Sequence, residues 1–203
     1  MHKMTVIHLA LLLPTALLLL WGCTSTAEKK ENVMLSAEQT DDAETQLKMA
    51  LEYDKKGQFE EAVACYRKAA EQGLSIAQNN LGVMYKDGQG VRKDYQEAVR
   101  WFRLAASQGN VLAQSNLGWM YQRGRGVAQN YDSARYWYTQ AALQDHAAAQ
   151  NNLGTMYRDG LGLKADTDSA RYWFEKAALH NLPQAQHNLQ QLKSESNTNI
   201  SGE

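Results

Sequence analysis

The chain has 203 residues, and its 21 Lys and Arg nearly balance its 22 Asp and Glu, for a net charge of −1. Basic residues alternate with acidic ones along the sequence and do not cluster. Because nucleic-acid binding depends on cations that neutralise phosphates, this charge pattern argues against a nucleic-acid partner.

Residues 1–22 have the features of a secretory signal peptide. Lys3 precedes an apolar run over 6–21, which Pro14 interrupts. The run is shorter than the ~20 apolar residues that a membrane-spanning helix needs. Its end, Leu20-Trp21-Gly22-Cys23, resembles the cleavage box of bacterial lipoproteins. This resemblance implies cleavage before Cys23 and fatty acylation of that cysteine, with a plain secretory signal or an uncleaved anchor as alternatives.

Residues 23–42 are predicted to form a lipidated, flexible tether. The segment is polar and charged, with Val33, Met34 and Leu35 as its few apolar residues. Thr24, and not Asp, follows Cys23, and resemblance to enterobacterial-type lipoproteins then favours the outer membrane. We therefore expect a protein of the cell envelope that is anchored by lipid and faces the periplasm.

A helical domain is predicted over 43–193, beginning with a variant unit at about 43–76. Met49-Ala50 and Tyr53 match the first half of the unit that follows, and Phe59 and Tyr66 match its second half. The connection between the two halves is four residues shorter than in later units. We expect its helices to start near Thr45 and Phe59.

One pattern is then repeated in register, starting at Ala77, Ala113, Ala149 and Ala185, each 36 residues apart. A fixed period in this range indicates a solenoid of stacked helical units. The predicted units are 77–112, 113–148 and 149–184, followed by a capping helix at 185–193 and a disordered tail at 194–203. First helices are expected to start at the four alanines, and second helices near Tyr95, Tyr131 and Thr167.

Each unit contains glycines and aromatic residues with structural explanations. Gly118 lies within a helix at a cost of ~1 kcal/mol, which implies that a neighbouring helix approaches closely. Gly124-x-Gly126 ends that helix. Trp101, Trp137 and Trp173 recur at one position and are expected in the core, where Cys65 takes the equivalent place as a buried thiol.

This pattern resembles the Sel-1-like repeat, a relative of the tetratricopeptide repeat, over about 77–189. The resemblance implies an all-α fold, a right-handed α-solenoid of stacked antiparallel helix pairs. It also implies that the chain holds another protein, without naming that partner.

No catalytic, cofactor or metal site is predicted. His146, His180 and His187 lack the spacing of metal ligands on one helix face. The Gly-x-Gly turns lack the preceding strand, third glycine and Lys of a phosphate-binding loop. We therefore expect a chain that is not an enzyme and holds no cofactor.

The predicted partner-binding surface lies on the first helices, which line the concave groove in the family that the chain resembles. Its residues stand at one set of positions in three units: Asn79, Val83 and Lys86; Ser115, Trp119, Gln122 and Arg123; Asn151, Thr155 and Arg158. Trp and Arg are enriched at binding hot spots, and the cations favour an acidic segment of the partner.

Three functions remain open at this point. The first is a non-catalytic adaptor or scaffold lipoprotein that binds a protein or peptide through the concave groove. The second is an immunity protein that neutralises a secreted toxin or effector in the periplasm. The third is a factor that binds or processes peptidoglycan or another cell-wall polysaccharide.

Overall fold

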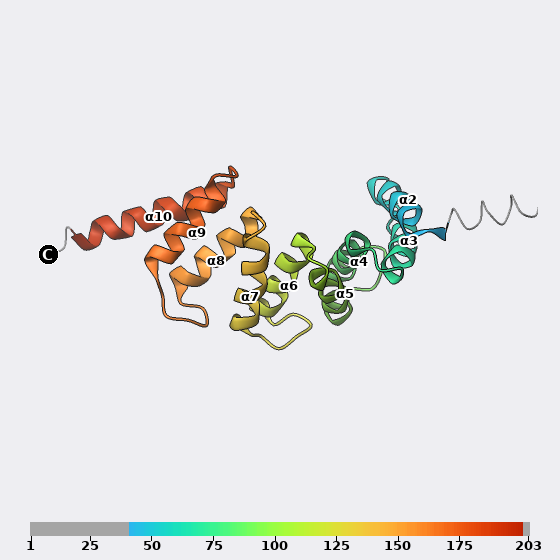
Figure 1. Cartoon of the computed structure of the whole chain (residues 1–203), viewed down its shortest axis with the longest axis horizontal. Helices are drawn as coiled ribbons and strands as arrows, with labels where there is room; N and C mark the ends of the chain where they lie inside the picture. The colour runs from blue at the N-terminus through green and yellow to red at the C-terminus, as the bar shows by residue number, and fades with distance from the viewer. Residues whose placement is uncertain (1–40, 201–203) are drawn as a thin grey trace, which may run out of the picture. The chain divides into compact units, whose positions relative to one another are not determined.

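The computed structural model describes residues 41–200, and it describes the side chains of 41–194. The predicted signal peptide, Cys23 and nearly all of the predicted tether lie outside this range. The described residues form helices joined by turns and loops, without a strand. The helices are α2 (Ala43–Lys55), α3 (Phe59–Glu71), α4 (Ser75–Asp87), α5 (Tyr95–Ser107), α6 (Val111–Arg123), α7 (Tyr131–Ala142), α8 (Ala147–Asp159), α9 (Thr167–Ala178) and α10 (Pro183–Ile200) (Figure 1).

Consecutive helices pack against each other in chain order. The closest packing joins α2 to α3, α4 to α5, α6 to α7 and α8 to α9, and each pair also contacts the next (Figure 1). Helix α10 packs against α9. Each unit therefore buries its apolar surface against its neighbours in sequence, which confirms the predicted α-solenoid.

The second helices start at the predicted residues, whereas the first helices of the later units start two residues earlier than predicted. For α6 and α8 the reason is local capping. Asn110 Oδ1 accepts a hydrogen bond from Ala113 N at 3.0 Å, and His146 Nδ1 accepts one from Ala149 N at 3.3 Å. A side chain that caps a free helical N–H fixes the helix start.

The two ends of the helical domain also differ from the prediction. Asp42, assigned to the tether, caps α2 through hydrogen bonds from Glu44 N and Thr45 N, both at 3.0 Å. Helix α10 continues to Ile200, past the predicted end at 193 and into the segment predicted as a disordered tail. After Pro183 no further proline or glycine interrupts this stretch before Gly202, so nothing in it breaks the helix.

The close approach expected at Gly118 is confirmed. A Cβ at this position would lie 2.7 Å from Cδ1 of Tyr138 in the partner helix α7. Gly82 and Gly154 lie equally close to Phe102 and Phe174. The glycine in each first helix therefore makes room for an aromatic ring of the second helix.

That ring, and not the neighbouring tryptophan, is the most deeply buried aromatic group of the later units. Tyr138 and Phe174 are 0% exposed, while Trp137 and Trp173 are partly exposed. The prediction that all three tryptophans are core residues is therefore wrong for these two. Each tryptophan instead packs against the apolar cluster of the preceding unit, and Trp101, at 3% exposure, is the most enclosed. Cys65 is buried as predicted, and burial raises its pKa.

The second glycine of each loop lies where the loop meets the preceding unit. Gly126 has a φ of +70°, and a Cβ there would overlap the backbone carbonyl of Tyr95 at the start of α5. Gly90 stands in the same relation to Phe59. The described first unit has no preceding unit to contact, which explains its shorter connection without the second glycine.

Candidate functional site

The ten predicted site residues lie on α4, α6 and α8, which present equivalent positions at 36-residue intervals. We call the surface formed by these ten residues the first-helix face. Its members differ in burial, in hydrogen bonding and in charge.

Asn79 and Asn151 do not have the exposure that was expected of them. They are 4% and 8% exposed, because each carboxamide bonds the first helix of the next unit. Asn79 Oδ1 accepts a hydrogen bond from Asn116 Nδ2 at 3.1 Å, and Asn151 Oδ1 accepts one from Asn188 Nδ2 at 2.9 Å. These two residues therefore join units, and the surface open to a partner is narrower than predicted.

Most of the other residues of the face are partly buried. Trp119 contacts the apolar clusters on both sides, one built around Phe102 and Leu117 and the other around Tyr138 and Leu153. Val83 and Thr155 occupy the same position in the flanking units, and Thr155 Oγ1 donates to the Asn151 carbonyl at 3.1 Å. Ser115 is also partly buried. Trp119 therefore covers the seam between units while its remaining surface stays open.

The charges of the face are paired at both ends and unpaired in the middle. Lys86 lies 2.7 Å from Asp87, and Arg158 lies 2.6 Å from Asp159. In the middle unit Gln122-Arg123 replaces these Lys-Asp and Arg-Asp pairs. Within the described part of the chain, Arg123 has no ion pair or hydrogen bond, so it is the cation of this face that is left to meet a partner.

The structure brings Gln122, Arg123 and Thr155 together around a hollow of about 490 Å³ between α6, α8 and the loops that follow them. Arg125, Asp159 and Leu161 complete much of its wall. Gln122 is held in place, since its Oε1 accepts from the Tyr138 hydroxyl at 2.9 Å and its carbonyl accepts from Gln129 Nε2 at 2.8 Å. The hollow is therefore polar and ordered, with a free guanidinium at its edge.

The shifted pKa values belong to packed or capping groups and not to a reactive pair. Burial raises the pKa of Tyr138, and burial together with nearby Asp54 raises that of Tyr66 to about 12. Burial lowers the pKa of His146, the cap of α8. Among the described residues, no cluster of His, Cys, Asp and Glu has the arrangement of a metal site. None of the described helices is long and apolar enough to span a membrane.

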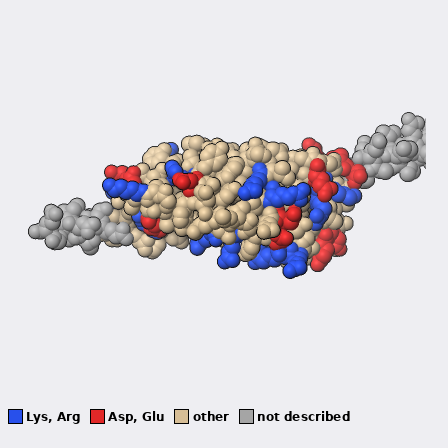
Figure 2. Space-filling model, turned by 90° about the horizontal axis from the view of Figure 1, so that it is seen from below, with Lys and Arg blue, Asp and Glu red and all other residues tan. Residues whose placement is uncertain are grey.

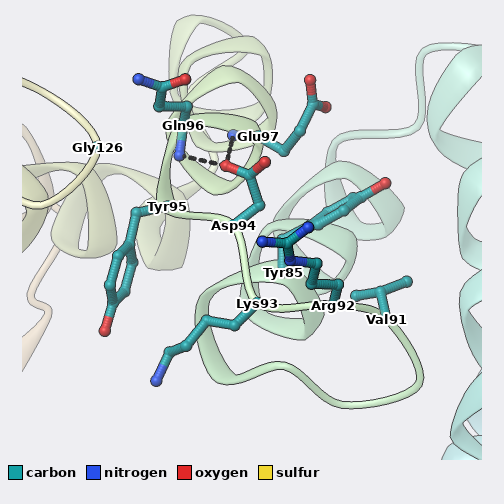
Figure 3. A pocket seen from close by; sticks show the side chains of 9 residues that line it. All are labelled: Tyr85, Val91, Arg92, Lys93, Asp94, Tyr95, Gln96, Glu97 and Gly126. Atoms are coloured by element: carbon teal, nitrogen blue, oxygen red, sulfur yellow. Dashed lines mark hydrogen bonds between the residues drawn. The ribbon is translucent and has the colours of Figure 1, made fainter.

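Sequence reasoning missed a second hollow, of about 830 Å³, at the loop before α5 (Figure 3). Arg92, Lys93 and Tyr95 contribute to its wall. A sequence signal existed: Arg92-Lys93 stands where the next copies have Ala128-Gln129 and Lys164-Ala165. The sequence did not predict this site, because folding brings Arg125 of the next loop close to Tyr95, beside Lys93.

Comparisons with known proteins agree with this geometry. The model of the Sel1 repeat matches residues 43–74, 75–110, 111–146 and 147–182. A search of curated proteins finds no match. Sel1 repeat proteins generally act as scaffolds for protein–protein interaction and not as catalysts.

Several solved structures share the fold. A protective antigen of uropathogenic Escherichia coli strains with an SLR fold is 39% identical, with a TM-score of 0.70 over 72% of this chain and 32% of its own. A Sel1 repeat protein from Oxalobacter formigenes is 35% identical, with a TM-score of 0.69 over 74% of this chain and 63% of its own. A putative sel1 repeat protein from Klebsiella pneumoniae, 19% identical with a TM-score of 0.51, covers 85% of this chain and 88% of its own and shares the fold alone.

The chain thus spans less than two thirds of the first two proteins that it resembles. Its four matched repeats nevertheless cover most of its own length and coincide with the helix pairs of the structure. On this evidence, the chain belongs to the Sel1 repeat family.

Proposed function

We propose that this protein is a non-catalytic adaptor of the bacterial cell envelope, anchored by lipid at Cys23, that binds an acidic segment of a partner protein. The observation that carries the proposal is the unpaired Arg123 at the edge of a polar hollow, next to the partly open Trp119. Trp and Arg are among the residues most enriched at binding hot spots, which cluster near the centre of protein interfaces.

The neighbouring units support the same site. Lys86 and Arg158 are already neutralised by adjacent carboxylates, so an incoming acid gains most from Arg123. The amide of Gln122 and the hydroxyl of Thr155 line the hollow and supply polar groups that can position a peptide main chain. Because the helices that carry these residues are packed on both sides, binding here costs little ordering of the protein.

The proposed location rests on the sequence. Leu20-Trp21-Gly22-Cys23 follows an apolar run of signal-peptide length. Several acyl chains on one cysteine are enough for stable attachment to a membrane. Thr24 after the modified cysteine favours the outer membrane, by resemblance to enterobacterial-type lipoproteins, and the chain would then face the periplasm. The similar Escherichia coli protein is called a protective antigen, which fits an exported chain.

Metabolic labelling tests the anchor. A fatty acid that carries a click-chemistry handle should label the full chain expressed in a bacterium with a lipoprotein pathway. The Cys23→Ser variant should not be labelled. Equal labelling of both proteins, or of neither, would contradict the anchor without bearing on the binding face.

Site-specific crosslinking tests the binding face. A photoreactive amino acid at position 119 or 123 should capture a partner in the envelope, whereas the same probe at exposed Glu175 on α9 should not. Trp119→Ala and Arg123→Ala should then each weaken binding of the purified partner by about tenfold or more, as hot-spot residues do. Full affinity in both variants, with unchanged thermal unfolding, would move the site away from the first-helix face.

A further inference from the structure

The hollow of about 830 Å³ lies between the loop before α5 and Gly126 of the next loop. Figure 3 shows Lys93 and Tyr95 extending from the loop to the same side, with Arg92 and Tyr85 on the other side of Asp94. None of the ten residues of the first-helix face lines this hollow. It is therefore a separate surface, built by the loops of two successive units.

Two cations from different loops flank one aromatic ring in this region. Lys93 Nζ lies 5.3 Å from the centroid of the Tyr95 ring, and Arg125 Cζ lies 5.6 Å from the same centroid. These contacts orient the cations without neutralising them. Within the part of the chain that the structure describes, Arg92, Lys93 and Arg125 form no ion pair with a carboxylate.

The two carboxylates of the hollow are already occupied. Asp94 Oδ1 accepts hydrogen bonds from Gln96 N at 2.8 Å and Glu97 N at 3.1 Å, as the dashed lines of Figure 3 show, and so caps α5. Glu97 Oε2 accepts a hydrogen bond from Arg100 Nη1 at 3.2 Å. The lining of this hollow therefore holds two cations and two carboxylates, and the excess of positive charge comes from Arg100 and Arg103 of the adjoining hollow.

Another hollow, of about 550 Å³, continues from the hollow of about 830 Å³ and shares Gln96 and Gly126 with it. It passes Val99, Arg103 and Leu104 on α5, and Leu104 is 42% exposed. Figure 2 shows basic side chains on this side of the molecule, interspersed with acidic ones, over the half that holds α2–α5. We call the two connected hollows the loop-edge groove.

We propose that the loop-edge groove binds an extended acidic peptide of a partner protein, in which Asp or Glu alternates with small aliphatic residues. Charge complementarity selects the acidic residues, since Arg92 and Lys93 line the groove without a carboxylate partner and Arg125 lies beside the same Tyr95 ring. The apolar side chains of Val91 and Leu104 line the same path and suit the aliphatic residues between them. An extended strand presents side chains alternately, which matches a path with both kinds of contact.

A peptide fits this groove better than an anionic membrane surface does. The cations line a recess whose wall also carries the carboxylates of Asp94 and Glu97. A flat layer of headgroups would meet these carboxylates together with the cations, whereas a narrow peptide can follow the cations and avoid them. Vesicles are accordingly the competing probe in the test.

The test measures binding of a fluorescent peptide of alternating Glu and Ala to the full chain by anisotropy at low salt. The peptide has about ten residues and measures ~33 Å when extended, at ~3.3 Å per residue. The same peptide with Gln in place of Glu is the control ligand. We expect the Glu peptide to bind, the Gln peptide to bind much more weakly, and added salt to reduce binding.

Two matched variants locate the site. Arg92→Gln with Lys93→Gln should weaken binding of the Glu peptide by about fivefold or more, since both cations line the groove. Lys164→Gln with Lys176→Gln removes the same charge from exposed positions in the fourth unit and should leave the affinity nearly unchanged. Loss of the Glu peptide in Trp119→Ala and Arg123→Ala, but not in the Arg92 and Lys93 variant, would place the peptide on the first-helix face and overturn the proposal.

Charge reversal completes the test. Arg92→Glu with Lys93→Glu should lose the Glu peptide and gain binding of the corresponding Lys peptide, a gain that a misfolded variant could not produce. Equal binding of the Glu and Gln peptides, or equal loss in the fourth-unit variant, would overturn the proposal. A protein that binds vesicles of anionic phospholipid through Arg92 and Lys93, and does not bind the Glu peptide, would also overturn it.

Discussion

Tyr138 and Trp137 are neighbours in sequence, yet they stabilise different interfaces. Successive residues of a helix point about 100° apart. Tyr138 therefore faces its own partner helix at Gly118, and its hydroxyl donates to Gln122. Trp137 packs back against the cluster around Phe102 in the preceding unit. The Tyr138 ring, within its unit, is fully buried, whereas the Trp137 ring, between two units, stays partly exposed.

This difference predicts unequal costs of truncation. Tyr138→Ala should reduce the free energy of unfolding by ~3–5 kcal/mol, the usual result of removing a fully buried aromatic side chain. Trp137→Ala should cost clearly less, because part of its ring already contacts solvent. Urea unfolding followed by circular dichroism provides the comparison. A larger loss for Trp137→Ala would place the main stabilising contact between units and not within them.

Residue-scale burial was also the hardest feature to predict from sequence. Asn79 and Asn151 share helix positions with residues that face outward, so periodicity alone assigned them to the groove. Their actual partners, Asn116 and Asn188, lie 37 residues further along the chain. Side-chain pairing across units depends on how closely the first helices approach, and one unit of sequence carries no such information.

At the scale of single helices, the capping side chains explain which helix starts could be predicted from the sequence and which could not. Three of the four second helices follow a capping side chain, Asp94, Asn130 or Asp166, whereas Gln58 before α3 makes no such hydrogen bond, and the predicted starts were confirmed. First helices lack such a uniform signal. The residue before them is Leu74, Asn110 or His146, and of these Asn110 and His146 cap through a side chain.

The histidine cap makes the stability of α8 depend on pH. His146 Nδ1 accepts the Ala149 N–H only when the imidazole is unprotonated at this atom, and burial holds its pKa below the usual 6.5. The unfolded chain therefore takes up the proton first as the pH falls. The stabilising contribution is complete above pH ~6.5 and decreases below that pH, toward the lower pKa of the folded state.

Replacing the cap tests this effect. Asn110 shows that Asn serves the same position in the preceding unit. His146→Asn should remove the pH-dependent part, so the wild type should lose stability relative to the variant as the pH falls from about 7.5 to about 5.5. A difference that stays constant over this range would show that His146 does not titrate with unfolding. The remaining histidines are common to both proteins and cancel.

At the scale of the whole domain, stability passes from each unit to the next through shared clusters. Met84 and Trp101 join the first and second units in one cluster, and Trp119 contributes to the clusters on both sides of α6. The last cluster combines Phe174 of α9 with Leu192 of α10, which is 3% exposed. In such an arrangement stability is close to a sum of units and their interfaces, and terminal units are lost first.

Removal of α10 should therefore have a graded effect along the chain. A protein that ends at Leu182 exposes Ala170 and Phe174, which are fully buried in the intact structure. Native-state hydrogen exchange should then show much faster exchange for the amides of α8 and α9, while α4 and α5 keep most of their protection. Leu192→Gln should reproduce the effect in part, and the exposed Gln191→Ala on the same helix should not. Equal loss of protection from α4 to α9 would instead mean that the four units unfold as one cooperative body, with α10 stabilising all of them.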